Sequence, residues 1–304
     1  MAGDGPVVVL GGTGMLGEQV VTELLARGKP VRAVVRPASD ATRLEQAGAE
    51  IARGDMMDPE SLLRAMDGAD AVVTTAAGYT RHSQGDTDEI DKIGNRNLAE
   101  AASRAGVRRF VLTSILTCDQ TPQVPHFWHK KLAEDRLQEL GVPFVSLRPG
   151  AFLDLITRMG GDPFAKRQLM WFGDPTIPLT FVLTPDLAGY LADAVDAPGV
   201  DGQHIDIGWD RPVTIQEIAH ISGRLLGDEI GVSGTIPTRP TSTAAAPEGR
   251  SNQMANDLNP MVQWFQTGRY VANTARQREV FGAVPTAEDA IARLLRSLGH
   301  AVTA

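Results

Sequence analysis

The chain has 304 residues, of which 42% are hydrophobic and 22% charged, a composition ordinary for a globular protein and unlike that of a disordered chain. Its net charge of −8 argues against a nucleic-acid-binding surface, which normally needs a basic stripe. With one cysteine, Cys118, an intramolecular disulfide is excluded and a cysteine zinc site is disfavoured. No signal peptide or membrane-length apolar run is apparent, so we expect a soluble, cytoplasmic protein that binds no membrane.

Strand and helix signals alternate from the N-terminus onward. The apolar run at 7–10 is typical of a strand buried on both faces of a parallel sheet, and apolar residues at helical spacing follow up to Gly28. Further strands are predicted over 31–35, 50–52, 69–75, 109–113 and 143–147, and helices over 59–66, 90–105 and 128–140. This alternation predicts an α/β, doubly wound parallel-sheet Rossmann fold.

The alternation loosens after residue 150. Residues 152–178 are rich in aromatic residues, Gly and Pro, which favours a lid of loops and helices. A strand is predicted over 203–207, helices over 184–195, 214–226 and 287–298, and a mobile loop over 238–256. We therefore predict a Rossmann domain over 1–150 and a smaller C-terminal substrate-binding or lid region over 151–304, intertwined with the first.

A glycine-rich loop joins the first strand to the first helix. Gly11 permits the tight turn, Gly14 lets the backbone approach a pyrophosphate, and Gly17 lets the helix pack closely on the sheet. The N-terminus of the helix then offers free N–H groups to the phosphates. The predicted cofactor contacts in this loop are Gly11, Thr13, Gly14, Met15, Leu16 and Gly17.

The end of the second strand decides between NAD and NADP. Folds that bind NAD usually carry Asp or Glu there, about 20 residues past the loop, to hold the ribose hydroxyls. No acidic residue stands between Val31 and Ser39, and Arg36 follows the strand. A guanidinium can bind a 2′-phosphate through two N–H groups, and Ser39 can add a hydroxyl. The sequence therefore predicts NADP(H) as the cofactor.

Several motifs together are similar to those of one family. They are the glycine loop at 11–17, Arg36, Gly54-Asp55, the helix end at 101–107, Thr113-Ser114, and the segment 147–150. The first 150 or so residues resemble the NmrA-like group of atypical short-chain dehydrogenases/reductases. That group includes NADP-dependent reductases of quinones, dyes and plant phenolics, and also proteins that sense the dinucleotide without turning it over.

The resemblance implies further cofactor contacts. Asp55 and Met56 should border the adenine, and the small residues Ala76, Ala77 and Gly78 should pass beside the nicotinamide ribose. Along the nicotinamide itself we expect Pro149, Gly150, Ala151 and Phe152. Thr113 and Lys130 complete the implied set.

The candidate catalytic residues depart from the usual pattern, because one of the usual three is missing. Short-chain reductases generally use Ser, Tyr and Lys, with the Tyr one helical turn before the Lys. Ser114 follows the fifth strand, where that serine belongs, and Lys130 lies in the next predicted helix. The tyrosine position holds His126, which falls before the predicted helix start.

A second alignment takes Lys131 as the lysine and puts Phe127 at the tyrosine position; the phenol is missing in both. Histidine can replace it in acid–base work because its ordinary pKa is near neutrality, and His129 is a second candidate. A lysine can also act alone through a bound water, as the resemblance to phenolic reductases implies. We predict catalytic roles for Lys130, His126 and Ser114.

These features favour an NADP-dependent oxidoreductase. Without a tyrosine, hydride transfer suits electron-poor acceptors such as quinones, enones or aryl ketones, which demand little proton donation. The C-terminal part supplies side chains that suit a flat, apolar or aromatic small molecule. They are Phe152, Met159, Phe164, Met170, Trp171, Phe172, Trp264, Phe265 and Tyr270.

Two other functions stay open. The missing tyrosine favours an NADP(H)-sensing regulatory protein with no turnover, whereas Ser114 and Lys130 favour the reductase. A nucleotide-sugar epimerase shares the glycine loop, but it would be expected to keep the tyrosine and to hold NAD, which Arg36 disfavours. No HExxH motif is present, and no metal is predicted. The sequence leaves the oligomeric state open, a homodimer being one option.

Overall fold

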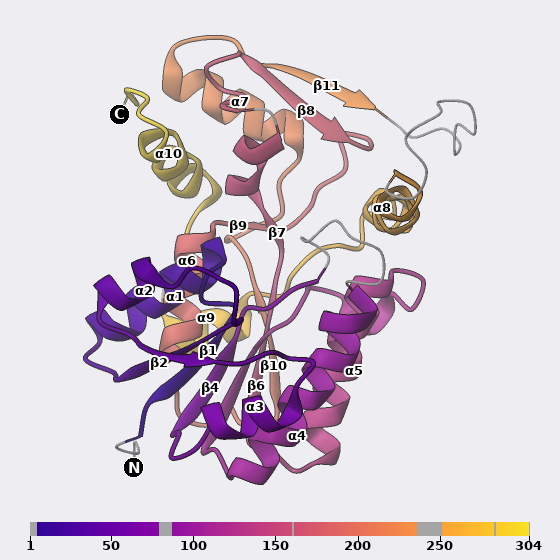
Figure 1. Ribbon diagram of the computed structural model, residues 1–304. Coiled ribbons are helices and arrows are strands. Elements are labelled where there is room, and N and C mark those ends of the chain that lie inside the picture. The colour runs from indigo at the N-terminus through magenta and orange to yellow at the C-terminus, as the bar shows by residue number, and fades with distance from the viewer. Residues whose placement is uncertain (1–4, 79–86, 160, 236–250, 283, 304) are drawn as a thin grey trace. The chain divides into compact units, whose positions relative to one another are not determined.

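The computed structural model describes residues 5–78, 87–159, 161–235, 251–282 and 284–303. Seven strands form its main sheet, in the order β10-β6-β5-β4-β1-β2-β3 (Figure 1). Their bounds are β1 Val7–Leu10, β2 Val31–Val35, β3 Glu50–Arg53, β4 Ala71–Thr74, β5 Arg109–Thr113, β6 Phe144–Pro149 and β10 Gln203–Ile207. Val7 of β1 lies opposite Val31 of β2 on one side and Ala71 of β4 on the other, both in parallel. The strand order therefore reverses between β1 and β4, which confirms the predicted Rossmann fold.

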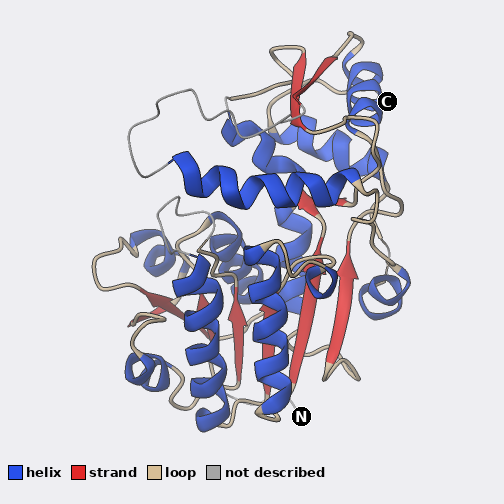
Figure 2. Ribbon diagram, turned by 90° about the vertical axis from the view of Figure 1, so that its right-hand side faces the viewer, coloured by secondary structure: helices blue, strands red, loops and turns tan. Residues whose placement is uncertain are grey.

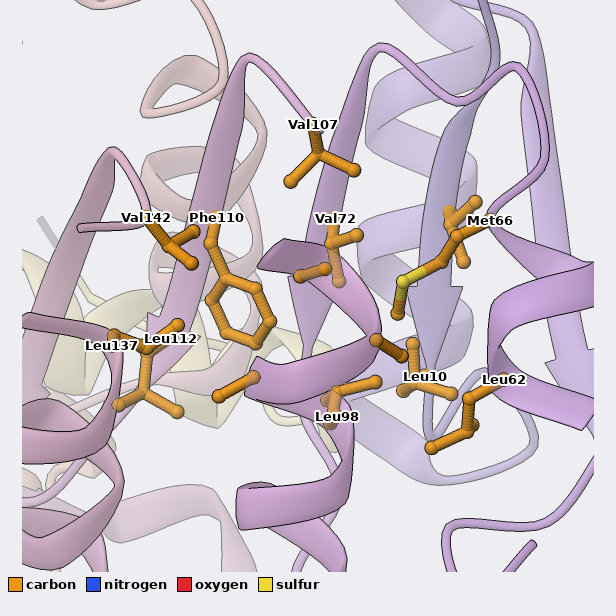
Figure 3. Packing of buried hydrophobic residues seen from close by; sticks show 14 of the residues in the cluster. Leu10, Leu62, Met66, Val72, Leu98, Val107, Phe110, Leu112, Leu137 and Val142 are labelled. Carbon is orange, nitrogen blue, oxygen red and sulfur yellow. The ribbon is translucent and has the colours of Figure 1, made fainter. Parts of the chain in front are cut away.

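Helices cover both faces of the sheet. They are α1 Met15–Ala26, α2 Thr42–Ala47, α3 Pro59–Ala65, α4 Asn95–Ala105, α5 Pro125–Glu139 and α6 Thr184–Asp193, with a π-helix, η2 Thr87–Gly94, before α4 and a 3₁₀ turn, η3 Cys118–Gln120, before α5. Figure 2 shows helices lying alongside the row of strands. On one face Leu62 of α3, Leu98 of α4 and Leu137 of α5 pack against apolar side chains of the strands, among them Val72 and Phe110 (Figure 3). These side chains are at most 1% exposed, so this layer is a dry core that fixes the helices on the sheet.

Local signals account for several helix ends. The carboxylate of Asp58 accepts a hydrogen bond from the Ser61 N–H, and Pro59 occupies the first turn of α3, as a cap followed by proline predicts. Gly106 ends α4 with φ of +65°, a conformation that favours glycine. The sequence-predicted start and end of these helices therefore have a direct physical basis.

The chain divides into two compact units. The first comprises Met1–Arg148 and Thr184–Ile205, and the second comprises Pro149–Leu183 and Asp206–Ala304. The second contains β7 Ala151–Phe152, η4 Leu153–Met159, β8 Gln168–Phe172, β9 Phe181–Val182, α7 Ile215–Leu226, β11 Gly231–Thr235, α8 Ser251–Gln266, α9 Ala275–Phe281 and α10 Ala287–Ser297. Within it β7 pairs with β9, and β8 pairs with β11. Between the two parts of the second unit the chain returns to the first unit, where it forms α6. Helix α6 packs on α1, and Asp193 of α6 forms an ion pair with Arg27, at the end of α1, at 2.9 Å.

Three local predictions were wrong. Helix α5 begins at Pro125, so His126 lies inside the helix rather than in a loop before it; a proline in the first turn lacks only an N–H that is unpaired there anyway. Residues 251–256, predicted as the end of a mobile loop, belong to α8, while 236–250 lie outside the described residues. The predicted lid of loops and helices contains strand β8, which pairs with the sequence-distant β11.

Among the residues that the structure describes, every helix is too short or too polar to cross a bilayer.

Candidate cofactor and active site

The glycine-rich loop lies at the carboxyl end of β1, where the strand order reverses. Gly11 has φ of +81°, and a Cβ on it would lie 2.7 Å from Thr75 Oγ1 and 2.9 Å from the Ala76 nitrogen. A Cβ on Gly17 would lie 2.1 Å from the Gly11 carbonyl oxygen. Both positions therefore admit only glycine, for the close turn and close helix approach that the spacing predicts.

The outer side of the loop is open. Thr13 and Gly14 are exposed, and a Cβ on Gly14 would meet only the Gly11 carbonyl oxygen, at 3.2 Å, among the described atoms. Helix α1 starts at Met15, followed by Leu16, and no side chain caps its N-terminus. The N–H groups of its first turn therefore remain available to a ligand. This uncapped N-terminus behind a small, exposed loop fits a pyrophosphate group.

Two arginines lie at the turn after β2. Arg36 is exposed, and its carbonyl oxygen accepts the Ser39 N–H at 3.0 Å. Arg53, the last residue of β3, donates from Nη1 to the carbonyl oxygens of Arg36 at 3.2 Å and Ser39 at 2.7 Å. The pairing of β2 with β3 brings Arg53 here, and the sequence analysis did not include it. The turn thus carries two guanidinium groups and a hydroxyl, the donor set that a 2′-phosphate needs.

The predicted adenine contacts differ in their surroundings. Asp55 is half-buried, and its carboxylate accepts the Met57 N–H at 2.9 Å. The side chain of Met56 packs in the hydrophobic core, while its carbonyl oxygen accepts from Asn97 Nδ2 at 2.9 Å. Of the two, Asp55 has the more accessible side chain.

Lys130 lies directly against the segment that follows β4. Its Nζ donates to the Ala76 carbonyl oxygen at 3.0 Å and lies 3.2 Å from Asp91 Oδ1. The side chains of Lys130 and Asp91 are 5% and 1% exposed. The Gly78 N–H donates to the other oxygen of Asp91 at 3.0 Å, and Ala77 is half-buried between these two contacts. The predicted catalytic lysine and the predicted nicotinamide-ribose segment therefore meet around one buried ion pair.

Both candidate histidines are buried on α5. Burial lowers the pKa of His126 to about 4; the charges of His129 and Lys130 act in the same direction, and Asp91 opposes them. Burial also lowers the pKa of His129, whose Nδ1 lies 3.1 Å from the Thr87 carbonyl oxygen. His126 is therefore neutral at physiological pH, so it carries no imidazolium proton that it could donate as a general acid.

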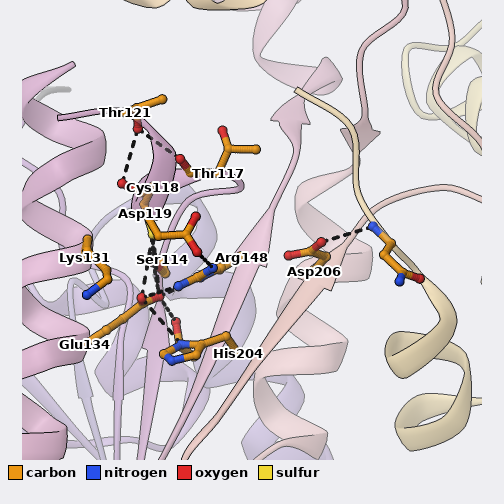
Figure 4. A network of polar contacts seen from close by, with 12 residues as sticks. Ser114, Thr117, Cys118, Asp119, Thr121, Lys131, Glu134, Arg148, His204 and Asp206 are labelled. Atoms are coloured by element: carbon orange, nitrogen blue, oxygen red, sulfur yellow. Dashed lines mark hydrogen bonds and ion pairs between the residues drawn. The ribbon is translucent and has the colours of Figure 1, made fainter. Parts of the chain in front are cut away.

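Ser114 joins a buried polar network around Glu134 (Figure 4). Its hydroxyl donates to Glu134 Oε1 at 2.8 Å, and Ser146 donates to the same oxygen at 2.6 Å. Arg148 donates to both carboxylate oxygens, at 3.0 and 2.6 Å. Burial acts to raise the pKa of Glu134, but hydrogen bonds from His204 and Arg148 hold that pKa well below its usual range. The Ser114 proton is thus engaged by a carboxylate, which leaves the oxygen as a hydrogen-bond acceptor.

The neighbouring Thr113 is the last residue of β5. Its Oγ1 is buried and has no hydrogen-bond partner among the described residues. Buried hydroxyls are normally satisfied, so this one fits a site where a bound molecule supplies the partner.

The predicted nicotinamide segment, 149–152, opens the second unit. The Ala151 N–H donates to the Thr180 carbonyl oxygen at 2.9 Å, and a Cβ on Gly150 would lie 2.4 Å from that same oxygen. Glycine at 150 is therefore required by the close passage of these two backbones.

Three of the predicted substrate-binding aromatic residues pack together inside the second unit. The rings of Trp171 and Phe265 stack with centroids 6.5 Å apart, and those of Phe265 and Tyr270 lie 4.6 Å apart. Met170 and Phe172 of β8 are instead 67% and 43% exposed. These three rings accordingly form core, whereas the Met170 and Phe172 side chains face outward.

Asp91 is a second residue of the site that could not be predicted from the sequence. It stands in a polar stretch and carries no motif, and its role emerges only when η2 packs on α5. Among the described residues, no group of His, Cys, Asp and Glu is arranged to hold a metal ion.

Comparisons with known proteins identify the kind of protein to which this chain is similar. The family model described as NAD(P)H-binding matches residues 11–197. The Photosystem II assembly factor Ycf39 of Synechocystis sp. is 28% identical over 227 residues, which is 75% of this chain and 69% of that protein.

Solved structures share the fold at low identity. The triphenylmethane reductase of Citrobacter sp., complexed with NADP(H), has a TM-score of 0.76 at 18% identity, covering 95% of this chain and 100% of that one. The NADPH-dependent quinone oxidoreductase QOR2 of Escherichia coli has a TM-score of 0.73 at 19% identity, covering 95% and 99%. The chain belongs to the NAD(P)H-binding family, which agrees with the resemblance found in the sequence and confirms the predicted dinucleotide cofactor.

Proposed function

We propose that this protein is an NADP-dependent oxidoreductase that transfers hydride to an apolar, electron-poor acceptor such as a quinone, an enone or an aryl ketone. One observation carries the proposal: the buried Lys130 ammonium donates to the carbonyl of Ala76, whose own nitrogen lies against Gly11 of the phosphate loop. Burying a charge is costly unless it is paired and hydrogen-bonded. A surface lysine would extend into solvent, whereas Lys130 is held in this buried place by the Ala76 carbonyl oxygen and Asp91.

NADP rather than NAD follows from the turn after β2. Arg36, Ser39 and the additional Arg53 supply two positive charges and a hydroxyl. No acidic residue stands between Val31 and Ser39 to accept from ribose hydroxyls at the end of β2. Against NAD those charges would have no phosphate partner. The cofactor roles of Asp55, Thr113 and residues 149–152 belong to the same proposal, as does a substrate-binding role for the second unit.

The choice of acceptor follows from what the site can donate. The bound cofactor supplies the hydride, so the protein has to provide position and a proton. Burial lowers the pKa of both His126 and His129, so neither is a good proton source. The Ser114 hydroxyl already donates to Glu134, and we therefore assign the proton to the Lys130 ammonium. Quinone-like acceptors spread the incoming charge and need the least help from an acid. The quinone and dye reductases that share this fold support this class of acceptor.

A protein that binds NADP(H) and a partner protein without turnover is the second candidate. The tyrosine position holds the buried, neutral His126, and the Synechocystis relative is named for assembly of a complex rather than for a reaction. An epimerase is disfavoured, because a proton-transferring tyrosine is missing and the Arg36 turn suits NADP.

The test is a panel of quinones, enones and aryl ketones offered with NADPH and, in parallel, with NADH. Loss of NADPH absorbance with at least one acceptor, much faster than with NADH, is the expected result. Tight binding of NADPH by calorimetry with no acceptor reduced would support the partner-binding candidate instead.

A further inference from the structure

Asp91 is a buried carboxylate that joins two parts of the candidate site. It lies in the π-helix η2, a type of helix that is rare and frequently occurs at functional sites. One of its oxygens faces the Lys130 ammonium at 3.2 Å. The other accepts the Gly78 N–H at 3.0 Å and the Thr87 hydroxyl at 3.1 Å.

These contacts restrain the lysine from two sides. The Lys130 side chain reaches the Ala76 carbonyl oxygen on the segment after β4, and Asp91 holds Gly78 of the same segment. The ammonium, the carboxylate and the backbone of 76–78 therefore form a closed arrangement in which none can move without disturbing the others. A long lysine side chain loses much rotamer freedom in this way, so it is fixed before any ligand arrives.

We propose that Asp91 is a positioning residue, which fixes the Lys130 ammonium and residues 76–78 and thereby acts on the reduction step rather than on NADP(H) affinity. The inference rests on the proposed function. It adds to that function a residue with no motif in the sequence. Asp91 contacts Lys130 on α5 and Gly78 on the segment after β4, and within η2 it accepts from Thr87. The cofactor's phosphates would be held elsewhere, by the glycine loop and the Arg36 turn, so affinity and reduction rate should separate.

The first experiment compares Asp91→Asn with Glu89→Gln. Glu89 is an exposed carboxylate in the same π-helix, so both variants remove one negative charge from η2. Asparagine retains an oxygen for Gly78 or Thr87 but cannot pair with the ammonium. We expect kcat with the best acceptor to fall about 10- to 100-fold in Asp91→Asn, the size of loss that a small misplacement causes. The calorimetric Kd for NADP⁺ should stay close to that of the wild type, and Glu89→Gln should change neither value.

A second measurement does not depend on turnover. Acetic anhydride acylates accessible amines, and peptide mass spectrometry gives the extent at each lysine. In the wild type Lys130 should be acylated far more slowly than Lys131, whose side chain is 25% exposed. In Asp91→Asn the labelling of Lys130 should rise severalfold. Thr87→Val, which removes one hydrogen bond to Asp91 and leaves the ion pair, should give a smaller rise.

The outcomes separate the inference from the proposed function. If the wild type reduces an acceptor and Asp91→Asn behaves like Glu89→Gln, the inference is overturned and the reductase stands. An equal loss of kcat and of NADP⁺ affinity in Asp91→Asn would also overturn it, since a general loss of structure gives that result. If the wild type reduces nothing, the proposed function fails, and unchanged labelling of Lys130 in Asp91→Asn would then overturn the fixing of the lysine as well.

Discussion

His126 shows how burial alters the chemistry that a residue type offers. Its place one turn before Lys130 could be predicted from the sequence, because the spacing of short-chain reductases is local. That it is buried on α5 could not, since burial depends on what packs over the helix. With a pKa lowered to about 4, chiefly by burial, this histidine is no substitute for a tyrosine that gives up a proton near neutral pH.

The lowered pKa predicts a specific dependence of stability on pH. Between about pH 6.5 and 4 the unfolded chain protonates this histidine and the folded protein does not, so the unfolded state binds more protons. The free energy of unfolding should therefore fall as pH is lowered through this window, by up to about 3 kcal/mol from His126. Urea unfolding at several pH values should show that His126→Phe flattens this part of the slope; an unchanged slope would contradict the neutral, buried assignment.

Arg53 and Asp91 mark the limit of residue-level prediction. Arg36 could be found because it follows its own strand, whereas Arg53 reaches the same turn only through the β2–β3 pairing. Asp91 reaches Lys130 only through the packing of η2 on α5. Neither contact leaves a local pattern in one sequence.

The Arg36 turn predicts cofactor preference. Arg36→Ala and Arg53→Ala should each weaken NADPH binding by about 1.5–3 kcal/mol, or roughly ten- to hundredfold, because each removes charged hydrogen bonds to a phosphate. NADH, which lacks the 2′-phosphate, should bind nearly unchanged. Calorimetric titration with both cofactors gives the answer, and equal losses for NADPH and NADH would rule out a 2′-phosphate role for the turn.

At the scale of elements, α5 carries the candidate chemistry and is anchored by charge. Glu134 lies one turn beyond Lys130 and accepts hydrogen bonds from residues of β6 and from Ser114 after β5. Its side chain is 1% exposed and that of Arg148 is 9% exposed, so the pair sits almost entirely away from water. The helix itself could be predicted, with Gly141 marking its end, but this anchoring depends on strands that are distant in sequence.

Removing the negative charge of Glu134 should lower the stability of the folded protein. Glu134→Gln leaves Arg148 buried without its full counter-charge, and we expect a loss of about 3 kcal/mol in the free energy of unfolding. Glu139→Gln on the same helix is the matched control, because that side chain is 64% exposed and should matter by no more than about 0.5 kcal/mol. Denaturant unfolding of both variants provides the comparison, and equal losses would refute the anchoring role.

At the scale of the whole molecule, the first unit could be predicted far better than the second. The glycine loop, the buried strands and several helix ends are local signals with counterparts in the structure, although the start of α5 was predicted wrongly. The second unit depends on pairings between distant segments, such as β8 with β11, and the sequence offers no period or cap that reports them. The chain also returns to the first unit through α6, a crossing that depends on packing against α1 rather than on any turn signal.

The central claim is that Lys130, fixed beside the phosphate loop, serves a reduction by NADPH. The most direct test is the rate of NADPH oxidation with a naphthoquinone in the wild type, Lys130→Ala and Lys131→Ala. Lys131 is the neighbouring lysine, paired with Asp135 at the surface, and it controls for the loss of one charge on α5. We predict turnover in the wild type and in Lys131→Ala and its near-complete loss in Lys130→Ala. Turnover that survives in Lys130→Ala would contradict the role given to this lysine.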